Sequence, residues 1–128
     1  MKKKGTRAER ELLHLFWENN WVCSRIAGSG STSFPSPDLI AGNPLRTLAI
    51  ECKSIKGTYK QLNKEKIDEL LSFANKFGSE AWLAIRFDNI GWYFLDINKL
   101  PLNKNGNYSI TLDLAKERGV KIEELIQS

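Results

Sequence analysis

The chain has 128 residues, a length that suits one domain with its own hydrophobic core. Hydrophobic residues make up 41% of it, which is ordinary for a globular protein and excludes a largely disordered chain. The net charge of +4 is compatible with a polyanionic partner but does not demand one. No apolar stretch approaches membrane-spanning length, so we expect a single domain over residues 1–128 without membrane contact.

The small number of cysteine and histidine residues argues against disulfide-stabilised and zinc-binding proteins. Cys23 and Cys52 fall in predicted strands, where we expect small buried side chains in a reducing compartment rather than a disulfide. With His14 as the single histidine and two cysteines that are not clustered, we do not expect a structural zinc site. The lysines at positions 2–4 are not followed by an uninterrupted apolar run, so we expect no signal peptide and a cytoplasmic location.

The first predicted element is a helix. Residues 6–9, Thr-Arg-Ala-Glu, have the form of a capping box, so the helix is expected to start near Thr6 and to end near residues 19–20. A strand is predicted over residues 21–26. The Gly- and Ser-rich segment 27–36 is predicted to be a loop, either a solvated connector or a place for substrate contacts.

A hairpin is predicted next, and it gathers charged side chains. Apolar residues 39–41 and 48–50 flank the turn signal Gly42-Asn43-Pro44. Such a hairpin brings the start of one strand near the end of the other, so Asp38 and Glu51 are expected to meet at one sheet edge. Lys53 lies two residues after Glu51 and therefore projects from the same face.

Two carboxylates and an ammonium group in one place suit a Mg²⁺ site that cuts phosphodiesters. Mg²⁺ prefers oxygen ligands and is commonly held by one or two carboxylates together with phosphate and water. The alternative is a surface salt bridge between Glu51 and Lys53, with Asp38 as a turn residue. The apolar neighbours favour the functional interpretation, because charges within a buried strand are costly unless they are paired or bound to metal.

The second half of the chain predicts a mixture of helices and strands. A polar, basic loop is predicted over residues 55–62, and Asn63 is expected to cap a helix that ends at Phe77 before Gly78. The remaining expected elements are strands at 81–87, 92–96 and 109–111, a short helix capped by Asp113, and a last helical turn at 122–126. This order favours an α/β sheet flanked by helices over a regular βαβ repeat.

Several motifs occur in order along the chain: Gly5-Thr6-Arg7-Ala8-Glu9-Arg10-Glu11-Leu12, Arg25, Pro37-Asp38-Leu39-Ile40-Ala41-Gly42, Ile50-Glu51-Cys52-Lys53, Phe73-Ala74-Asn75-Lys76-Phe77-Gly78 and Ala84-Ile85-Arg86-Phe87. Together they resemble the archaeal Holliday junction resolvases, up to about Trp92. The resemblance implies the restriction-endonuclease-like fold, with a central mixed β-sheet flanked by helices. It also implies a nucleoid-associated homodimer that cleaves four-way DNA junctions with Mg²⁺, for which Mn²⁺ can substitute.

The same resemblance implies a catalytic set, consisting of Glu9, Asp38, Glu51 and Lys53. Asp38 and Glu51 would be side-chain metal ligands, together with the carbonyl of Cys52. Glu9 would bind metal through water or orient a ligand, whereas local sequence alone assigns it to the capping box. The loop over residues 27–36 is longer than in the shortest family members and resembles that of longer-loop resolvases, in which a serine assists activity. That role is carried to Ser29, with Ser31, Ser33 and Ser36 as competitors.

Basic side chains and one helix complete the expected interfaces. Helix 63–77 is the candidate dimer interface, with Phe73 and Phe77 as anchors, although packing in the chain's own core is the alternative for them. The sequence identifies no protein partner other than a second copy of the chain. Arg10 and Arg25 match family positions near the site, and the candidate phosphate contacts are Lys2, Lys3, Lys4, Arg7, Arg10, Arg25, Lys56 and Lys60.

Two other functions remain open at this point. One is a different nuclease of the PD-(D/E)xK superfamily that cuts duplex, flap or mismatched DNA, because that superfamily shares the Asp38…Glu51-Cys52-Lys53 pattern. The other is a DNA-binding module whose nuclease site has decayed. The complete set of four catalytic positions argues against decay.

Overall fold

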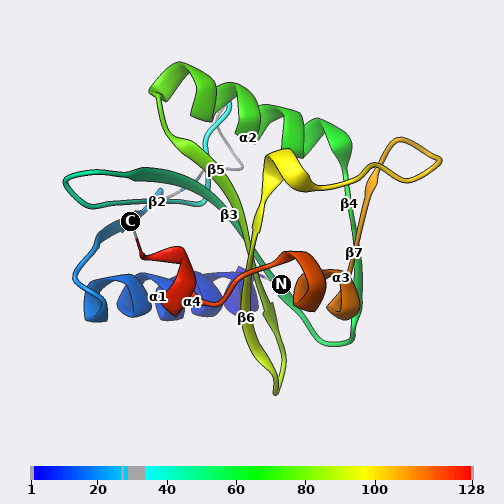
Figure 1. Cartoon of the computed structure of the whole chain (residues 1–128), viewed down its shortest axis with the longest axis horizontal. Coiled ribbons are helices and arrows are strands. Elements are labelled where there is room, and N and C mark those ends of the chain that lie inside the picture. The colour runs from blue at the N-terminus through cyan, green and yellow to red at the C-terminus, as the bar shows by residue number, and fades with distance from the viewer. Residues whose placement is uncertain (1, 27, 29–33, 128) are drawn as a thin grey trace.

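A five-stranded mixed sheet forms the centre of the fold (Figure 1). A computed structural model of the chain describes residues 2–26, 28 and 34–127, with side chains from residue 5 onward. The strand order is β1-β2-β3-β5-β6, in which β3 and β5 are parallel and the other neighbours antiparallel. The strands are β1 (Val22–Arg25), β2 (Leu39–Gly42), β3 (Thr47–Ile55), β5 (Glu80–Phe87) and β6 (Gly91–Asp96).

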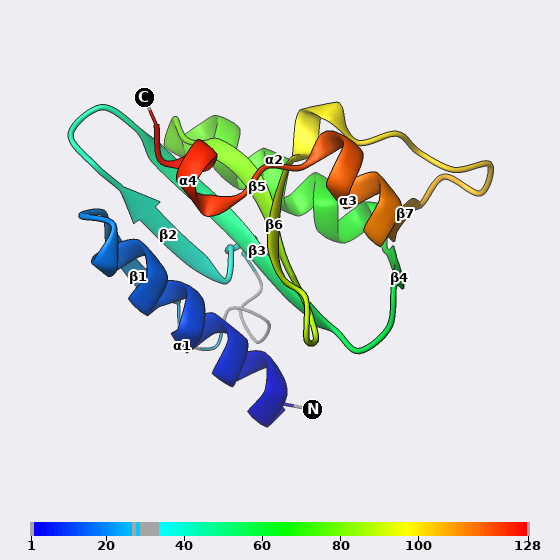
Figure 2. The ribbon, with the colours of Figure 1, turned by 60° about the horizontal axis from the view of Figure 1, so that its bottom comes forward.

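The other elements cover the two faces of this sheet or extend beyond it. Figures 1 and 2 show α1 (Lys2–Glu18) and α2 (Lys64–Phe77) on opposite sides of the strands. A second, two-stranded antiparallel sheet pairs β4 (Tyr59–Leu62) with β7 (Tyr108–Thr111). The remaining elements are the 3₁₀ helix η1 (Ile97–Lys99), α3 (Leu112–Arg118) and α4 (Ile122–Leu125). Within the described part of the chain, no helix is long and apolar enough to cross a bilayer.

Alternation along β3 decides which side chains each face receives. Leu48, Ile50 and Cys52 join the hydrophobic cluster that contains α1, whereas Ala49 and Ile55 join the cluster that contains α2. Successive side chains of a strand point to opposite faces. Glu51 and Lys53 therefore share the α2 face of the sheet with Ala49 and Ile55.

Helix α1 is anchored by a single apolar stripe. Ala8, Leu12 and Phe16 recur at four-residue spacing and are 4%, 0% and 0% exposed. The predicted capping box was wrong, because α1 begins at Lys2 and Thr6 already lies within the helix. An N-cap residue needs a non-helical backbone, and lysine is a good helix former, so the helix continues through the basic start of the chain.

The predicted helix after Asn63 is confirmed as α2. The Asn63 side chain accepts a hydrogen bond from the Glu65 backbone N–H at 2.7 Å, which caps the helix. Gly78 ends the helix with a left-handed backbone (φ 82°), a conformation that glycine adopts without strain. The predicted β2–β3 and β5–β6 hairpins and the short strand near residues 109–111 are also confirmed.

Two predictions for the second half were wrong. Residues 59–62, predicted as part of a basic loop, form β4, because Lys60 pairs with Ile110 across the small sheet. Lys60 is therefore a strand residue. Asp113 does not cap α3; the Thr111 hydroxyl accepts the Leu114 backbone N–H at 3.0 Å instead. Asp113 lies in the first turn, where its negative charge complements the helix dipole.

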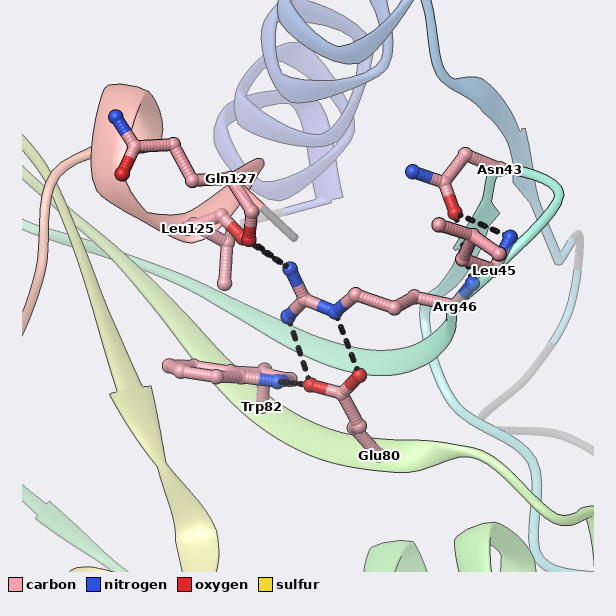
Figure 3. Close-up of polar contacts among 7 residues, drawn as sticks. All are labelled: Asn43, Leu45, Arg46, Glu80, Trp82, Leu125 and Gln127. Carbon is pink, nitrogen blue, oxygen red and sulfur yellow. Dashed lines mark hydrogen bonds and ion pairs between the residues drawn. The ribbon is translucent and has the colours of Figure 1, made fainter.

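An arginine ties the last described residues to the sheet (Figure 3). The Arg46 guanidinium donates to both carboxylate oxygens of Glu80, each at 2.8 Å. Its Nη1 atom donates to the backbone carbonyls of Leu125, at 2.5 Å, and Gln127, at 2.9 Å. The Trp82 indole N–H also donates to Glu80, at 2.9 Å. Arg46, in the turn between β2 and β3, thus connects the start of β5 to the end of α4 and the residues after it.

Candidate active site

The register of the β2–β3 hairpin sets Asp38 beside Glu51. The antiparallel ladder ends with the pair Leu39–Ile50, so Asp38 lies directly beyond it, next to the β3 segment that carries Glu51. The Asp38 backbone N–H donates to the Ile50 carbonyl at 3.0 Å, and its carbonyl accepts the Ile26 N–H at 2.9 Å. Asp38 is therefore fixed by hydrogen bonds on both sides, between the end of β1 and the middle of β3.

Two polar contacts hold the residues that the sequence pattern singled out near one another. The Asp38 Oδ2 atom accepts the Cys52 backbone N–H at 2.9 Å. The Lys53 ammonium lies 3.4 Å from the Glu51 carboxylate. Asp38, Glu51 and Lys53 thus come together where the sequence predicted, at the end of the hairpin opposite its turn.

Glu51 is the most strongly perturbed carboxylate of the group. Burial, followed by the negative charge of Asp38, raises the pKa of Glu51 to about 7, and the Lys53 ammonium opposes this rise. A buried carboxylate next to a second one is stabilised by a proton or by a cation. The electrostatics of the hairpin end therefore favour the binding of positive charge.

Helix α1 contributes Glu9 to this group. Its carboxylate accepts a hydrogen bond from the Arg25 Nε atom at 3.1 Å, and the two side chains are 20% and 27% exposed. Burial raises the pKa of Glu9, as does the charge of Asp38, whereas Arg25 and Lys53 lower it. Glu9 is thus bonded to β1 and lies within electrostatic reach of Asp38. The cap that local sequence assigned to it does not form.

The donor set fits a hard divalent cation. Asp38 and Glu51 supply carboxylate oxygens, and the Cys52 carbonyl belongs to the strand between Glu51 and Lys53. The Cys52 thiol is buried in the hydrophobic cluster on the α1 face, and burial raises its pKa. Among the described residues, no three His, Cys, Asp or Glu side chains lie close enough to ligate one ion. Two carboxylates and a carbonyl, completed by water, are nevertheless a typical Mg²⁺ environment.

Comparison with known proteins decides the family. The family model described as archaeal Holliday junction resolvase (Hjc) matches residues 1–128. The chain belongs to this resolvase family. The resemblance read from the sequence motifs is therefore confirmed over the whole chain.

Similar resolvases are known from several archaea. The chain is 37% identical to the crossover junction endodeoxyribonuclease Hjc of Archaeoglobus fulgidus over 97% of this chain and 96% of the relative. It is 35% identical to that of Methanocaldococcus jannaschii, with the same coverage. The solved structure of A. fulgidus Hjc, a Holliday junction resolvase, matches with a TM-score of 0.87 at 35% identity, over 94% of this chain and 98% of that one. The expected fold class and the expected junction-resolving endonuclease are thereby confirmed.

Of the predicted resolvase contacts with DNA, Arg7, Arg10, Lys56 and Lys60 are exposed. Arg25 is half-buried, and its Nε atom donates a hydrogen bond to Glu9. The side chains of Lys2, Lys3 and Lys4 lie outside the described part of the chain. Ser29, together with its competitors Ser31 and Ser33, also lies outside the described residues.

The two phenylalanines of α2 differ in their surroundings. Phe73 is half-buried and packs against the hydrophobic cluster on the α2 face, whereas Phe77 is 52% exposed. Their ring centroids are 5.3 Å apart. They line a pocket of about 350 Å³ together with Phe34, which is 77% exposed, and residues 35, 72 and 76. An apolar surface therefore runs from α2 to the segment that leads into Asp38.

One basic residue near the site was not predicted. Lys66, in the first turn of α2, lowers the pKa of Glu51 through its positive charge. Its nearness follows from the crossover in which α2 connects β4 to β5 over the face that carries Glu51. The predicted Asn63 cap already placed Lys66 in the first turn of a helix. The position of that helix over Glu51 could not be predicted, because it depends on β4, which was predicted to be a loop.

Proposed function

We propose that this chain resolves four-way DNA junctions by hydrolysing one phosphodiester per subunit, with Asp38, Glu51 and Lys53 at the reacting centre. The observation that carries the proposal is the convergence of these three residues at the end of the β2–β3 hairpin, in a member of the resolvase family. Water adds to phosphorus and the 3′-oxygen leaves, so that the products carry a 5′-phosphate and a 3′-hydroxyl.

Mg²⁺ is the cofactor that we propose, with Mn²⁺ as a substitute. Asp38 and Glu51 would hold it through carboxylate oxygens, together with the Cys52 carbonyl. The raised pKa of Glu51 supports a site for positive charge at this position. When bound, the ion supplies Lewis-acid polarisation of the phosphate and a water of lowered pKa.

The other members of the set assist around this centre. Lys53, 3.4 Å from Glu51, orients the attacking water or offsets the charge that develops on the phosphate oxygens. Glu9, held by Arg25, would bind the metal through water or orient one of its ligands from α1. Ser29 assists from the loop before Asp38, as the family resemblance implies.

We propose a homodimer of single-domain subunits, each spanning residues 1–128. A two-fold dimer presents two equivalent sites to a junction that is itself nearly two-fold symmetric. Phe77, exposed on α2, is the proposed anchor together with Phe73, because an exposed aromatic side chain beside an apolar pocket suits an interface. Since its substrate is DNA, we expect the dimer in the cytoplasm, associated with the nucleoid.

Junction recognition would depend on shape and phosphate contacts rather than on base edges. The proposed phosphate contacts are Lys2, Lys3, Lys4, Arg7, Arg10, Arg25, Lys56 and Lys60. Arg7 and Arg10 are exposed on the helix that carries Glu9, so phosphates bound by them would lie near the reacting centre.

The deciding experiment uses pure protein and a synthetic immobile four-way junction, with duplex and flap DNA of matching sequence as controls. We expect paired cuts in the junction with Mg²⁺ or Mn²⁺, no cutting with EDTA, and products that DNA ligase can reseal. Equal cutting of duplex or flap DNA would favour a different PD-(D/E)xK nuclease. Metal-independent junction binding without any cutting would favour the non-catalytic module.

A further inference from the structure

Helix α1 is held to the sheet by two polar contacts, one on each side of its apolar stripe. A helix turns by about 100° per residue, so Glu9 and Glu11 lie about 80° to either side of the line through Ala8 and Leu12. Glu9 is bonded to Arg25 on β1. Glu11 is bonded to the β5–β6 hairpin on the other side.

The contact at Glu11 is built from two strands. Both carboxylate oxygens accept the Arg86 Nε–H, at 3.2 and 3.0 Å, and one of them accepts the Trp92 indole N–H at 2.6 Å. Arg86 and Trp92 are direct partners in the β5–β6 ladder, so they project from the same face. Asp88 accepts a further Arg86 N–H at 3.2 Å and orients the guanidinium.

This contact differs from an ordinary surface ion pair. Glu11 is 46% exposed, and an isolated pair at such a position contributes little to stability. Trp92, however, is only 7% exposed, and a buried indole N–H left without an acceptor is costly. Glu11 therefore satisfies a buried donor and fixes the rotation of α1 about its axis.

We infer that Glu11 is a positioning residue for the proposed cleavage reaction. By fixing α1 to the β5–β6 hairpin, it directs Glu9 towards Asp38 and Lys53. The inference rests on the proposed function for its catalytic consequence. Misplacement of a group at a reacting centre by about 1 Å can lower the rate by up to about 100-fold, so a moderate change in α1 is measurable.

The chain contains a matched control for this role. Glu80 also accepts two guanidinium bonds and one indole N–H, from Arg46 and Trp82 (Figure 3). Its partner Arg46 binds the end of the described chain, and none of the hydrogen bonds described for Glu80 reaches α1. Replacing Glu11 or Glu80 by alanine therefore removes equivalent bonds at different places. A purely structural role predicts the same behaviour for both variants.

The test compares Glu11→Ala, Glu11→Gln and Glu80→Ala in single-turnover cleavage of the immobile junction, well below the melting temperatures. We expect Glu11→Ala to cut about 10-fold more slowly, with junction affinity within about twofold of wild type. Glu80→Ala should keep the wild-type rate despite a comparable fall in melting temperature. Glu11→Gln, which can still accept the indole N–H, should recover most of the rate. Equal rates for the two alanine variants would overturn the inference.

A second measurement does not need activity. Amide hydrogen exchange in residues 5–12 should accelerate in Glu11→Ala and stay unchanged in Glu80→Ala, because only the first variant frees α1. If wild-type protein cuts no junction, the proposed function fails, and the exchange result still decides whether Glu11 holds α1. Unchanged exchange in Glu11→Ala would refute the positioning role.

Discussion

The Asp38 carboxylate accepts the backbone N–H of Cys52 at 2.9 Å, so the residue just before β2 is bonded to the β3 segment between Glu51 and Lys53. The carboxylate therefore has two functions, one structural and one electrostatic. The hydrogen bond holds the end of the hairpin together. The negative charge acts on Glu51 and raises its pKa.

Replacing Asp38 by asparagine separates these functions. The amide oxygen can still accept the Cys52 N–H, so the fold and junction binding should persist. The charge needed to hold a divalent cation is lost, so cleavage should fall by at least about 100-fold. Cleavage on denaturing gels and junction affinity by fluorescence anisotropy would measure the two effects. Asp113→Asn, on α3, is the control, and substantial cutting by Asp38→Asn would show that the metal assignment is wrong.

Phosphate contacts on α1 predict a strong dependence of junction affinity on salt. For duplex DNA, the logarithm of affinity falls with the logarithm of salt concentration, with a slope of about −0.9 per phosphate neutralised. Arg7→Gln and Arg10→Gln should each make that slope about 0.9 less steep, measured by titration at several KCl concentrations. Lys116→Gln, an exposed lysine on α3, should leave it unchanged. Wild-type slopes in both arginine variants would exclude α1 from the DNA-binding surface.

The proposed dimer can be tested at Phe77. This side chain is 52% exposed, so glutamate is tolerated by the monomer but would bury a charge in an interface. We expect Phe77→Glu to weaken association by at least about 2 kcal/mol, seen as a lower mass in light scattering across a concentration series. Leu45→Glu, at a position 78% exposed in the β2–β3 turn, should keep the wild-type mass. A dimer that survives Phe77→Glu would place the interface elsewhere.

The Arg46–Glu80 pair predicts a stability effect that depends on pH. Hydrogen bonds from Arg46 lower the pKa of Glu80 below its ordinary value of 4.5, against the effect of burial. Because the folded-state pKa is depressed, the stabilisation is fully present above about pH 4.5 and is lost as the pH falls through the folded-state pKa.

Glu80→Gln should therefore cost about 1 kcal/mol of unfolding free energy at pH 7, since the pair is partly exposed. In acid the difference from wild type should close, as measured by urea unfolding from pH 7 to pH 3. Glu117→Gln, at a side chain 75% exposed, should show little difference at any pH. A Glu80→Gln deficit that does not shrink as the pH falls would contradict the ionic origin of the effect.

Sequence alone predicted the elements whose signals are local. The β2–β3 hairpin follows from a turn signal between apolar runs, and α2 follows from Asn63 and Gly78. The strand β4 was missed because its partner β7 lies about 50 residues further along the chain. The sequence around Lys60 contains no local signal for that pairing. The predicted N-terminal cap at Thr6 was wrong because the helix begins earlier, at Lys2, so the capping-box residues lie inside it.

The candidate site also contains a part that local sequence predicted and a part that it did not. The spacing of Asp38, Glu51 and Lys53 was enough to predict their convergence, because a hairpin and the two-residue period of a strand fix it. The effect of the Lys66 charge on Glu51 and the hydrogen bonds of Glu11 were not predictable from local pattern. They depend on how α1 and α2 pack across the sheet, and their partners are distant in the chain.

The parallel pairing of β3 with β5 has a consequence for the newly made protein. Residues 48–55 of β3 pair with residues 80–87 of β5, which are synthesised after the whole of α2. β2 pairs only with residues 47–50 of β3, so until β5 leaves the ribosome the segment that bears Glu51 and Lys53 has no ladder partner. We therefore expect chains that stop before residue 80 to leave this part of β3 unpaired, so that Glu51 and Lys53 are held in place only after β5 has been made.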